Sequence, residues 1–574
     1  MIRHPRRTSF LTAAAAVLTA CAPDAPPVDP DAEVPSYPAA NRPDVRGTRG
    51  AVSADHPLAA QAGLRVLQEG GNAVDAALAM AGVLAVVRPH MNGVGGDAFV
   101  MVYEAATGEV YALNGSGRAG ALATPAFFRD QGLEEVPSTG PLSVSVPGAV
   151  AAWVDVHRRF GTKPFAALLE PAIAYARDGF PVSTRLASDF AEQGDALNDA
   201  GKALYLPRDG APPEVGSLLK NPALAATLER IARQGKAGFY EGPVAERLAS
   251  FLEAQGSHLR GTDFAAHAST WVTPVHGTYL DHDILAFPPN TQGPTQIQMF
   301  EIAKSFPLKE MGHNTSTYLH TLVEVKKLAF ADRDRWLADP EHADIPLNRL
   351  LDPTYLAERA RLVDAAHASE GFAPGIGGEG EEAGDRDDAG DTVYLTAVDP
   401  WGNAVSWIQS LFAGFGSGLL EPETGVMLHN RGSLYTLEDG HPNQVAPGKR
   451  PFHTLSPLLA LQGGQVAFTL GTPGGDSQPQ SLLQIVNNML LFGMTPQEAI
   501  EAPRFRSNRG TNLSLEHRVP LSVRNQLAAL GHDLRVVDGW TATFGGAQMI
   551  RVERAFGTLT VASDPRREAY GMAW

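Results

Sequence analysis

Thr392 would become an N-terminal residue, and thus a possible nucleophile, if the chain were cut just before it. A threonine at the start of a chain can use its own α-amine as the base that takes the proton from its side-chain hydroxyl. The residue before Thr392 is Asp391, and the sequence changes from acidic to apolar between these two residues. This setting suggests self-cleavage of the Asp391–Thr392 bond, followed by attack of the threonine hydroxyl on an amide.

Thr392 begins a predicted β-hairpin. Residues 392–398 are rich in β-branched and aromatic side chains, residues 399–403 have a turn composition, and a second apolar run covers 404–411. This pattern is typical of two antiparallel strands joined by a short loop. If Val398 faces Ala404, counting outward places Thr392 opposite Ser410, so that two hydroxyls meet at the cut.

The segment before the cut, residues 374–391, predicts a mobile acidic tether. Its only bulky apolar residue is Ile376, and one arginine, Arg386, stands among seven acids: Glu379, Glu381, Glu382, Asp385, Asp387, Asp388 and Asp391. Such a segment buries too little apolar surface to offset the entropy of ordering it. A simpler interpretation is a solvated loop that enters an ordinary strand, and the local pattern leaves both open.

The first 46 residues have the composition of a targeting segment. Residues 1–20 predict a signal peptide, because arginines precede an apolar stretch that is too short to span a bilayer. Residues 18–21 (LTAC) resemble a site that is cut before a lipidated cysteine, so Cys21 is the candidate lipidation site. Residues 21–46, rich in Pro, Ala and Asp, predict a disordered stalk. We expect an exported protein that is lipid-anchored at Cys21, in the periplasm or cell envelope.

The composition excludes several kinds of site. A single cysteine in 574 residues rules out an internal disulfide and a cysteine-built metal cluster. The net charge of −17 argues against nucleic acid or anionic lipid as a partner, so the lipid anchor is the only expected membrane contact. With 44% hydrophobic residues the chain can bury a large core, and residues 47–574 are expected to form one structural domain.

Helical and strand-like segments alternate along the body of the chain, which predicts helices layered on sheets. Helices are expected at residues 56–68, at 73–87 after a capping Asn72, and within 147–177 and 317–336. Strands are expected at 98–103, 465–470 and 559–562.

From about residue 47 to its end, the chain resembles the γ-glutamyltransferase (glutathione hydrolase) family of N-terminal-nucleophile hydrolases. The resemblance rests on the number and order of short motifs: residues 69–76 (EGGNAVDA), 93–96 (GVGG), 146–148 (VPG), 287–293 (FPPNTQG), 329–333 (AFADR), 391–392 (DT), 402–405 (GNAV), 471–475 (GTPGG) and 562–566 (ASDPR). It implies an α+β fold, a four-layer αββα sandwich. It also implies self-cleavage into a large chain, residues 47–391, and a small catalytic chain, residues 392–574, which remain intertwined as a heterodimer.

The resemblance also implies roles for individual residues. Thr392 matches the nucleophile and Ser410 the hydroxyl that bonds it, in agreement with the hairpin count. Gly474 and Gly475 match the oxyanion hole, where glycine lets backbone N–H groups approach developing negative charge. Arg118 matches the arginine that binds the substrate α-carboxylate, since a planar fork of donors fits a carboxylate. Without the resemblance, the glycines would be a tight turn and Arg118 a surface residue.

Four departures from the family pattern affect substrate recognition. The acid expected to bind the substrate α-amine is replaced by Leu434, which cannot compensate the desolvation of an ammonium. A serine pair is replaced by His453 and Thr454, and an asparagine by Phe412. Residues 435–448 are also too short for the usual lid loop. These features resemble the acylase- and amidase-like branch of the family. The candidate substrate-binding residues are Arg118, Arg431, His453 and Thr454.

Family membership implies hydrolysis of, or acyl transfer from, γ-glutamyl compounds such as glutathione through an acyl-threonine intermediate. The departures favour an alternative, an amidase or acylase for glutaryl- or oxamate-type amides, whose acyl group has a carboxylate but no α-amine. A third possibility is an inactive envelope lipoprotein of the same fold that binds a small ligand. The complete set of Thr392, Ser410, Gly474 and Gly475 argues against this third possibility.

Other motifs carry weaker signals. Residues 375–380 satisfy the dinucleotide pattern GxGxxG but lie in the acidic segment, with no strand before them. Ser477 is only a near match to the GxSxG nucleophile motif, and the 17 histidines form no HExxH-type ligand set. No cofactor and no metal site are expected.

Overall fold

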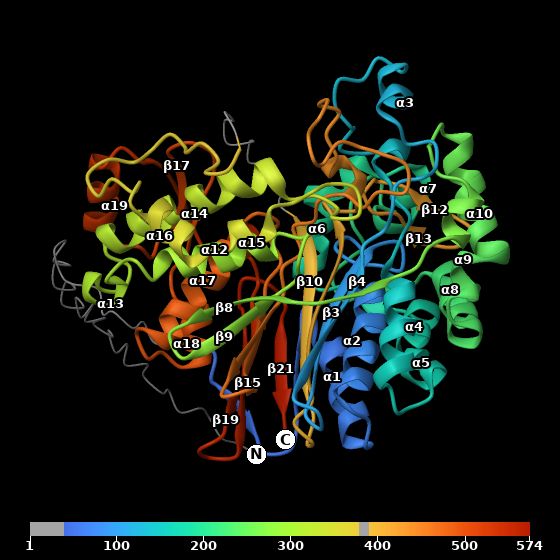
Figure 1. Cartoon of the computed structure of the whole chain (residues 1–574). Coiled ribbons are helices and arrows are strands. Elements are labelled where there is room, and N and C mark those ends of the chain that lie inside the picture. Colours follow the sequence, from blue (N-terminus) through green and yellow to red (C-terminus); the bar gives the residue numbers. More distant parts are fainter. Residues whose placement is uncertain (1–39, 378–389) are drawn as a thin grey trace, which may run out of the picture.

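The computed structural model describes residues 40–377 and 390–574, and two seven-stranded antiparallel sheets form its centre (Figure 1). The first sheet has the order β1 (Val45–Gly47), β20 (Thr558–Ser563), β19 (Gln548–Glu553), β15 (Gln465–Gly471), β14 (Leu458–Gln462), β9 (His282–Ala286) and β8 (Val275–Tyr279). The second has the order β21 (Tyr570–Ala573), β2 (Ala51–Ala54), β10 (Asp391–Val398), β11 (Ala404–Phe412), β3 (Asp97–Glu104), β4 (Glu109–Gly115) and β7 (Thr270–Val272).

Helices cover one face of each sheet (Figure 1). On the side of the second sheet lie α1 (Pro57–Gln68), α2 (Ala73–Val87) and α4 (Ala149–Phe160), with α5 (Phe165–Asp178), α8 (Pro222–Gln234) and α10 (Gly242–Ala254) farther out. On the side of the first lie α12 (Gly293–Ala303), α17 (Ser477–Leu490) and α18 (Pro496–Glu501), with α14 (Ser316–Trp336) and α16 (Pro353–Ala360) packed on α12. A third apolar cluster joins the sheets to each other, with Phe99 and Tyr394 from the second and Leu459 and Ile550 from the first.

Shorter elements surround this centre. They include a small sheet of β16 (Phe505–Ser507), β17 (Asn512–Glu516) and β18 (Asp533–Val537), the strand pairs β5 (Phe180–Pro181) with β6 (Leu218–Leu219) and β12 (Leu420–Glu421) with β13 (Val426–Met427), and the helices α3 (Pro125–Arg129), α6 (Thr184–Gln193), α7 (Asp199–Tyr205), α9 (Ala237–Tyr240), α11 (Gly261–Ala265), α13 (Leu308–Met311), α15 (Leu347–Leu350) and α19 (Leu521–Ala529).

The strand that carries Thr392 is buried on both of its faces. Along β10, Val393 and Leu395 point into the cluster beneath the helices, whereas Tyr394 points into the cluster between the sheets. A strand in such a position needs apolar residues at nearly every position, not only at alternate ones. This explains the continuous apolar run after residue 392.

Strands from before and after residue 391 are interleaved in both sheets. In the second sheet, β2 lies between β21 and β10, and β11 pairs with β3. In the first sheet, β1 pairs with β20 and β9 with β14. Both sheets are therefore built from the two parts of the chain that a cut at residue 391 would produce.

The mixed helix and strand content confirms an α+β fold, and several expected elements are found. α2 spans Ala73–Val87 after an Asn72 cap, whose side chain and that of Asp75 form a reciprocal capping box. The strands at 97–104, 465–471 and 558–563 match within one residue. The stretch 147–177 is divided into α4 and α5, because Gly161 ends the first helix and Pro164 precedes the second.

The expected signal peptide, Cys21, and most of the stalk and tether lie outside the described residues, which omit 1–39 and 378–389. The described ends of the stalk and tether are fixed, which corrects their predicted boundaries. Asn41 bonds to the Glu501 carboxylate and β1 begins at Val45. Ile376 is buried and its carbonyl accepts a bond from Trp336. Within the described ranges, no helix combines the length and apolarity needed to cross a bilayer.

Candidate active site

The β10–β11 hairpin has the register that the sequence predicts. Thr392 is paired with Ser410 and Val398 with Ala404. The loop between the strands is closed by Asp399, whose carboxylate accepts the N–H groups of Trp401 and Asn403. The count from the turn outward is therefore confirmed, and the two hydroxyls meet.

A continuous chain of hydrogen bonds joins the Thr392 hydroxyl to the carbonyl of the preceding residue. Thr392 Oγ1 donates to Ser410 Oγ over 3.0 Å, and Ser410 Oγ donates to the Asp391 carbonyl oxygen over 2.9 Å. The Ser410 oxygen also accepts the Phe412 N–H at 2.7 Å. Ser410 thus holds the Thr392 hydroxyl and donates its own proton to the neighbouring carbonyl.

Gly474 and Gly475 form a turn directly above this bond. A Cβ added to Gly390 would lie only 2.7 Å from the Gly475 nitrogen, so the turn is packed against the residue before Asp391. Both glycines have positive φ angles, +123° and +53°, and α17 begins two residues later. A backbone N–H at the start of a helix is suited to a developing negative charge. The turn is therefore both a tight turn and a possible oxyanion hole.

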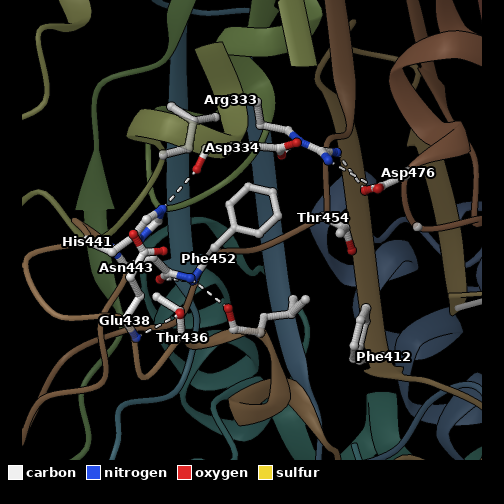
Figure 2. Close-up of a pocket in the computed structure, with 13 residues that line it drawn as sticks. Arg333, Asp334, Phe412, Thr436, Glu438, His441, Asn443, Phe452, Thr454 and Asp476 are labelled. Atoms are coloured by element: carbon white, nitrogen blue, oxygen red, sulfur yellow. Dashed lines mark hydrogen bonds and ion pairs between the residues drawn. The ribbon is translucent and has the colours of Figure 1, made fainter. Parts of the chain in front are cut away.

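A pocket of about 200 Å³ opens beside the hairpin and the glycine turn (Figure 2). Phe412 and Thr454 lie on one side of it, and Glu438, His441 and Asn443 on the other (Figure 2). The remaining lining residues are Arg333, Asp334, Leu337, Leu434, Thr436, Phe452, Gly475 and Asp476. The wall combines four apolar side chains with three carboxylates and one arginine.

Arg333, the arginine among the lining residues, is paired with two carboxylates. Its guanidinium lies 2.6 Å from Asp476 and 2.7 Å from Asp334, and it packs over the Phe330 ring. Burial alone would lower the pKa of Arg333, but Asp334 and Asp476 raise it above its usual value. The cation is permanently charged and its charge is already compensated.

Of the predicted binding residues, Thr454 reaches the pocket and Arg431 lies behind the pocket wall. Arg431 is buried, its guanidinium packs over the Phe412 ring at 4.5 Å, and its Nη1 donates to Thr454 Oγ1 over 3.2 Å. Phe412 has a positive φ of +81°, a conformation that is costly for an aromatic residue. Arg431 therefore supports the two residues that form the floor near Ser410.

His453 does not line the pocket but belongs to a buried cluster around Asp97. The Asp97 carboxylate contacts His429 Nδ1 at 3.0 Å and His453 Nε2 at 3.1 Å, and it lies 3.5 Å from Arg431 Nε. Burial would raise the pKa of Asp97, but His429 and His453 hold it well below its usual value. Burial and Arg431 lower the pKa of His453 to about 3.

Asp97 was missed in the sequence, although a signal was present. It is the acid that follows Gly95 and Gly96 and opens an otherwise apolar strand, where an acid is rarely buried without partners. It is also paired across the sheet with Ser410. Asp97 therefore links the arginine and histidine behind the pocket to the strand that carries the Thr392 partner.

Arg118 is not brought together with the other predicted residues. Its guanidinium donates to Glu341 at 2.8 Å and to the Gly448 carbonyl at 2.8 Å. It lines a separate pocket that also contains Asp263 and His267. The pocket beside Thr454 and Leu434 thus receives no contact from Arg118.

The short segment 435–448 forms one wall of the pocket. Lys449 Nζ donates to the Gln444 carbonyl at 2.8 Å, and Asn443 Nδ2 donates to the Leu434 carbonyl at 2.6 Å. The hydroxyl of Tyr435 donates to the Lys449 carbonyl. These bonds hold the segment in a compact loop, and its residues Thr436, Glu438, His441 and Asn443 face the pocket.

Among the described residues, one cluster has metal-ligand composition: His320, Glu324 and His532. Its atoms already have partners. His320 Nδ1 and His532 Nε2 are bonded to each other at 2.9 Å, and Glu324 is paired with Lys327 at 2.7 Å. The hydrogen bonds and the ion pair account for the cluster without an ion.

Comparison with known proteins identifies the family. Residues 59–574 match the family model described as γ-glutamyltranspeptidase. The chain belongs to the γ-glutamyltranspeptidase family. It is 38% identical over 529 residues to the "glutathione hydrolase-like YwrD proenzyme" of Bacillus subtilis, covering 91% of this chain and 98% of that protein. It is 37% identical over 532 residues to the "oxamate amidohydrolase proenzyme" of Klebsiella pneumoniae, covering 90% and 97%.

A solved structure leads to the same assignment. The crystal structure of cephalosporin acylase from Bacillus halodurans superimposes with a TM-score of 0.86 at 34% identity, covering 95% of this chain and 99% of that one. These relatives of the γ-glutamyltranspeptidase family are named as hydrolases and acylases. The prediction of an enzyme in this family, similar to its acylases and amidohydrolases, is therefore confirmed.

Proposed function

We propose that the protein is an N-terminal threonine hydrolase that cuts its own chain between Asp391 and Thr392 and then hydrolyses amides. The observation that carries this proposal is the bonded chain from Thr392 Oγ1 through Ser410 Oγ to the Asp391 carbonyl. Nucleophile, polarising donor and target carbonyl lie within a few ångströms in one rigid hairpin. Such preorganisation contributes strongly to intramolecular reactions.

The proposed cut has two steps, the formation of an ester and its hydrolysis. Thr392 Oγ1 attacks the Asp391 carbonyl carbon, the C–N bond breaks, and the hydroxyl proton passes to the leaving nitrogen. The product is an ester between Asp391 and Thr392 Oγ1, together with a free α-amine. Water then opens the ester, leaving a carboxylate on Asp391 and the hydroxyl on Thr392.

Turnover uses the same threonine with a new base. The free α-amine has a reference pKa of about 7.7 to 8.0, so a useful fraction is unprotonated near neutral pH. It takes the Oγ1 proton as the oxygen attacks an amide carbonyl, while the N–H groups of Gly474 and Gly475 stabilise the oxyanion. The amine leaves with that proton, and water releases the acyl group from Thr392.

We infer that the fold is the four-layer αββα sandwich of N-terminal-nucleophile hydrolases and that the two fragments remain one heterodimer. One apolar cluster lies between the second sheet and its helices, one between the first sheet and its helices, and one between the two sheets. This arrangement supports the four layers. The interleaved strands support continued association after the cut, because neither fragment can form either sheet alone.

For the substrate, we propose amides whose acyl group lacks the α-amino acid head of a γ-glutamyl group. Leu434 and Phe412 present apolar surface where that head would need polar partners. Arg118 lies in another pocket, and Arg333 is already paired with Asp476. The pocket therefore offers little positive charge to a carboxylate on the acyl group of the substrate. An acyl chain that is apolar next to the reacting carbonyl fits this wall.

A second candidate is γ-glutamyl hydrolysis, of glutathione among other compounds. One observation favours it: Asp334, Glu438 and Asp476 line the pocket and could receive an ammonium group. The name of the Bacillus subtilis relative agrees with this candidate, and that of the Klebsiella pneumoniae relative agrees with the first.

The cut is tested by N-terminal sequencing of the smaller band on a denaturing gel. We expect two bands, with the smaller one beginning at Thr392, and we expect a Thr392→Ala variant to remain one inactive band. An active wild-type protein that stays a single full-length chain would contradict the proposal.

The acyl group is tested with three p-nitroanilides of equal chain length. The γ-glutamyl compound has an α-amine and a carboxylate, the glutaryl compound only the carboxylate, and the valeryl compound neither. We expect kcat/KM for the γ-glutamyl compound to be the lowest, by roughly tenfold to a hundredfold, since one uncompensated charged group costs about 1.5–3 kcal/mol. A higher value for the γ-glutamyl than for the glutaryl compound would establish the second candidate instead.

We also propose export and lipid anchoring at Cys21, supported by the sequence of residues 1–46. Cys21→Ser should release the protein from the membrane fraction and abolish labelling by a fatty acid. Unchanged labelling in that variant would refute the anchor.

A further inference from the structure

Asp391, on the amino side of the proposed cut, has a buried ion-pair partner far along the chain. Arg567 Nη2 lies 2.9 Å from Asp391 Oδ1, and both side chains are 2% exposed. Arg567 belongs to the segment that follows β20, 176 residues after Asp391. The residue whose carbonyl is to be attacked is therefore held by its side chain as well as by its main chain.

The backbone is irregular at this bond, so the side-chain contact has a geometric role. A β-bulge lies between Asp391 and Thr392: Thr392 is paired with Ser410, whereas Asp391 is paired with Phe412. The extra residue is Leu411 on β11, between the partners of Asp391 and Thr392, and an insertion of this kind bends the ladder locally. Beside it, the Asp391 carbonyl accepts the Ser410 hydroxyl at 2.9 Å, while the carboxylate is held by Arg567.

Arg567 lies near a group of buried charges. Asp55 and Asp189, with Asp391, raise its pKa against the lowering effect of burial. Arg88 lies within 3.7 Å of Asp55 and of Asp189. It also lies 2.9 Å from Glu568, the residue next to Arg567. Arg567 Nη1 contacts Met91 Sδ at 3.4 Å, so both terminal nitrogens of the guanidinium have a partner, one of them Asp391.

The pair also removes an electrostatic obstacle. The Asp391 carboxylate is two bonds from the α-carbon that carries the reacting carbonyl, and an unpaired negative charge there would oppose the negative charge that develops on the carbonyl oxygen. Arg567 compensates the carboxylate. The same ion pair thus positions the carbonyl and favours its conversion to an oxyanion.

We propose that Arg567 is a positioning residue for self-cleavage: it holds Asp391 so that its carbonyl faces the Ser410 hydroxyl within reach of Thr392 Oγ1. This inference rests on the proposed cut at the Asp391–Thr392 bond. Arg567 contacts neither Thr392 nor the pocket among the described contacts, so its role belongs to the cut and not to turnover.

The test is a time course of cutting by the full chain made by cell-free translation and followed on a denaturing gel. Arg567→Met should slow the cut by about 10²-fold, the usual cost of a small misplacement of reacting groups. Arg567→Lys should restore most of the rate, because it keeps the charge. In each variant, kcat/KM per molecule of small fragment should equal the wild-type value.

The partner residue provides the decisive comparison. Asp391→Asn removes the charge that Arg567 compensates, so the double variant Asp391→Asn/Arg567→Met should cut faster than Arg567→Met alone. The control is Arg450→Met, which removes an arginine of similar burial, paired with Glu341 at 2.7 Å, and should leave the cutting rate unchanged.

The outcomes separate this inference from the proposed function. Wild-type cutting with an unchanged rate in Arg567→Met would overturn the positioning role and leave the cut at Thr392 standing. A wild-type chain that never cuts would overturn the proposed function. Equal losses in cutting rate and in kcat/KM per small fragment, with no rescue by lysine, would show that Arg567 only stabilises the fold.

Discussion

At the scale of single residues, Ser410 has the most demanding position in the site. Its one hydroxyl accepts from Thr392 Oγ1 and from the Phe412 N–H, and donates to the Asp391 carbonyl. A hydroxyl has one donor and two acceptor positions, so all three are used. Its single proton is directed at the Asp391 carbonyl, which makes Ser410 the polarising group of the proposed cut.

Ser410→Ala should therefore slow the cut by about 10²-fold, the usual cost of losing one donor to an oxyanion. The rate is measured as the decay of the full-length band. Ser406→Ala is the matched control, because Ser406 lies on the same strand and is equally buried but donates to the Leu458 carbonyl. Equal cutting rates in the two variants would contradict the role of Ser410.

Leu434 permits a second prediction at this scale, a change of substrate preference. Leu434→Asp places a carboxylate in the pocket wall next to the apolar Phe412. It should raise kcat/KM for γ-glutamyl-p-nitroanilide relative to the glutaryl compound by about tenfold, because a charge-assisted bond to the α-amine becomes available. Leu434→Asn, of similar shape without the charge, should give a smaller change. No change in the ratio for either variant would place the α-amine elsewhere.

At the scale of elements, the turn after β15 places Gly474 and Gly475 against Gly390, next to the bond of the proposed cut. Gly474 has a φ of +123°, and a Cβ there would lie 2.2 Å from Ser477 Oγ. The turn needs glycine for its backbone conformation and for space. It joins the first sheet, through β15, to α17, so the proposed oxyanion hole is placed by two elements that do not carry Thr392.

Gly474→Ala should accordingly lower turnover by about 10²-fold, because the strained turn moves its N–H groups away from the oxyanion. Gly464→Ala is the control: Gly464 also has a positive φ, +74°, but a Cβ there would meet open space. It should lose about 1–2 kcal/mol of stability and retain turnover. Initial rates with glutaryl-p-nitroanilide check both, and full activity in Gly474→Ala would exclude this turn from catalysis.

The sequence predicted the local elements of the site better than its long-range contacts. The hairpin register followed from a turn of fixed length, and α2 from the Asn72 cap. The Asp97 cluster joins residues more than 300 positions apart. The local periodicity that predicts strands and helices does not show which distant residues come into contact. Arg118 was matched by a motif, but its neighbours Glu341 and Gly448 come from distant segments.

At the scale of the whole molecule, buried histidines couple stability to pH. Burial lowers the pKa of several of them from 6.5, among them His56, His267 and His453 to about 3 and His258 to about 4. These groups stay neutral in the folded state at pH values where the unfolded chain takes up protons. The free energy of unfolding should therefore fall as the pH falls below about 6.5.

The expected slope approaches at most about 1.4 kcal/mol per pH unit for each histidine. Asp55 opposes it weakly: its pKa is raised to about 6 by burial, so stability is gained as the pH falls from about 6 toward 4. Four groups outweigh one, so the urea midpoint should be clearly lower at pH 5.0 than at pH 7.5. An equal or higher midpoint at pH 5.0 would contradict this account.

The interleaving of strands from either side of residue 391 has a consequence for how the molecule can be remade. Before the cut, an unfolded chain can refold by itself, since β2 and its neighbours β10 and β21 belong to one polypeptide. After the cut, the same sheets need an encounter between two separate chains, so recovery from denaturation becomes second order and depends on concentration. The proposed cut would thus make refolding depend on the protein concentration, whereas folding before the cut does not.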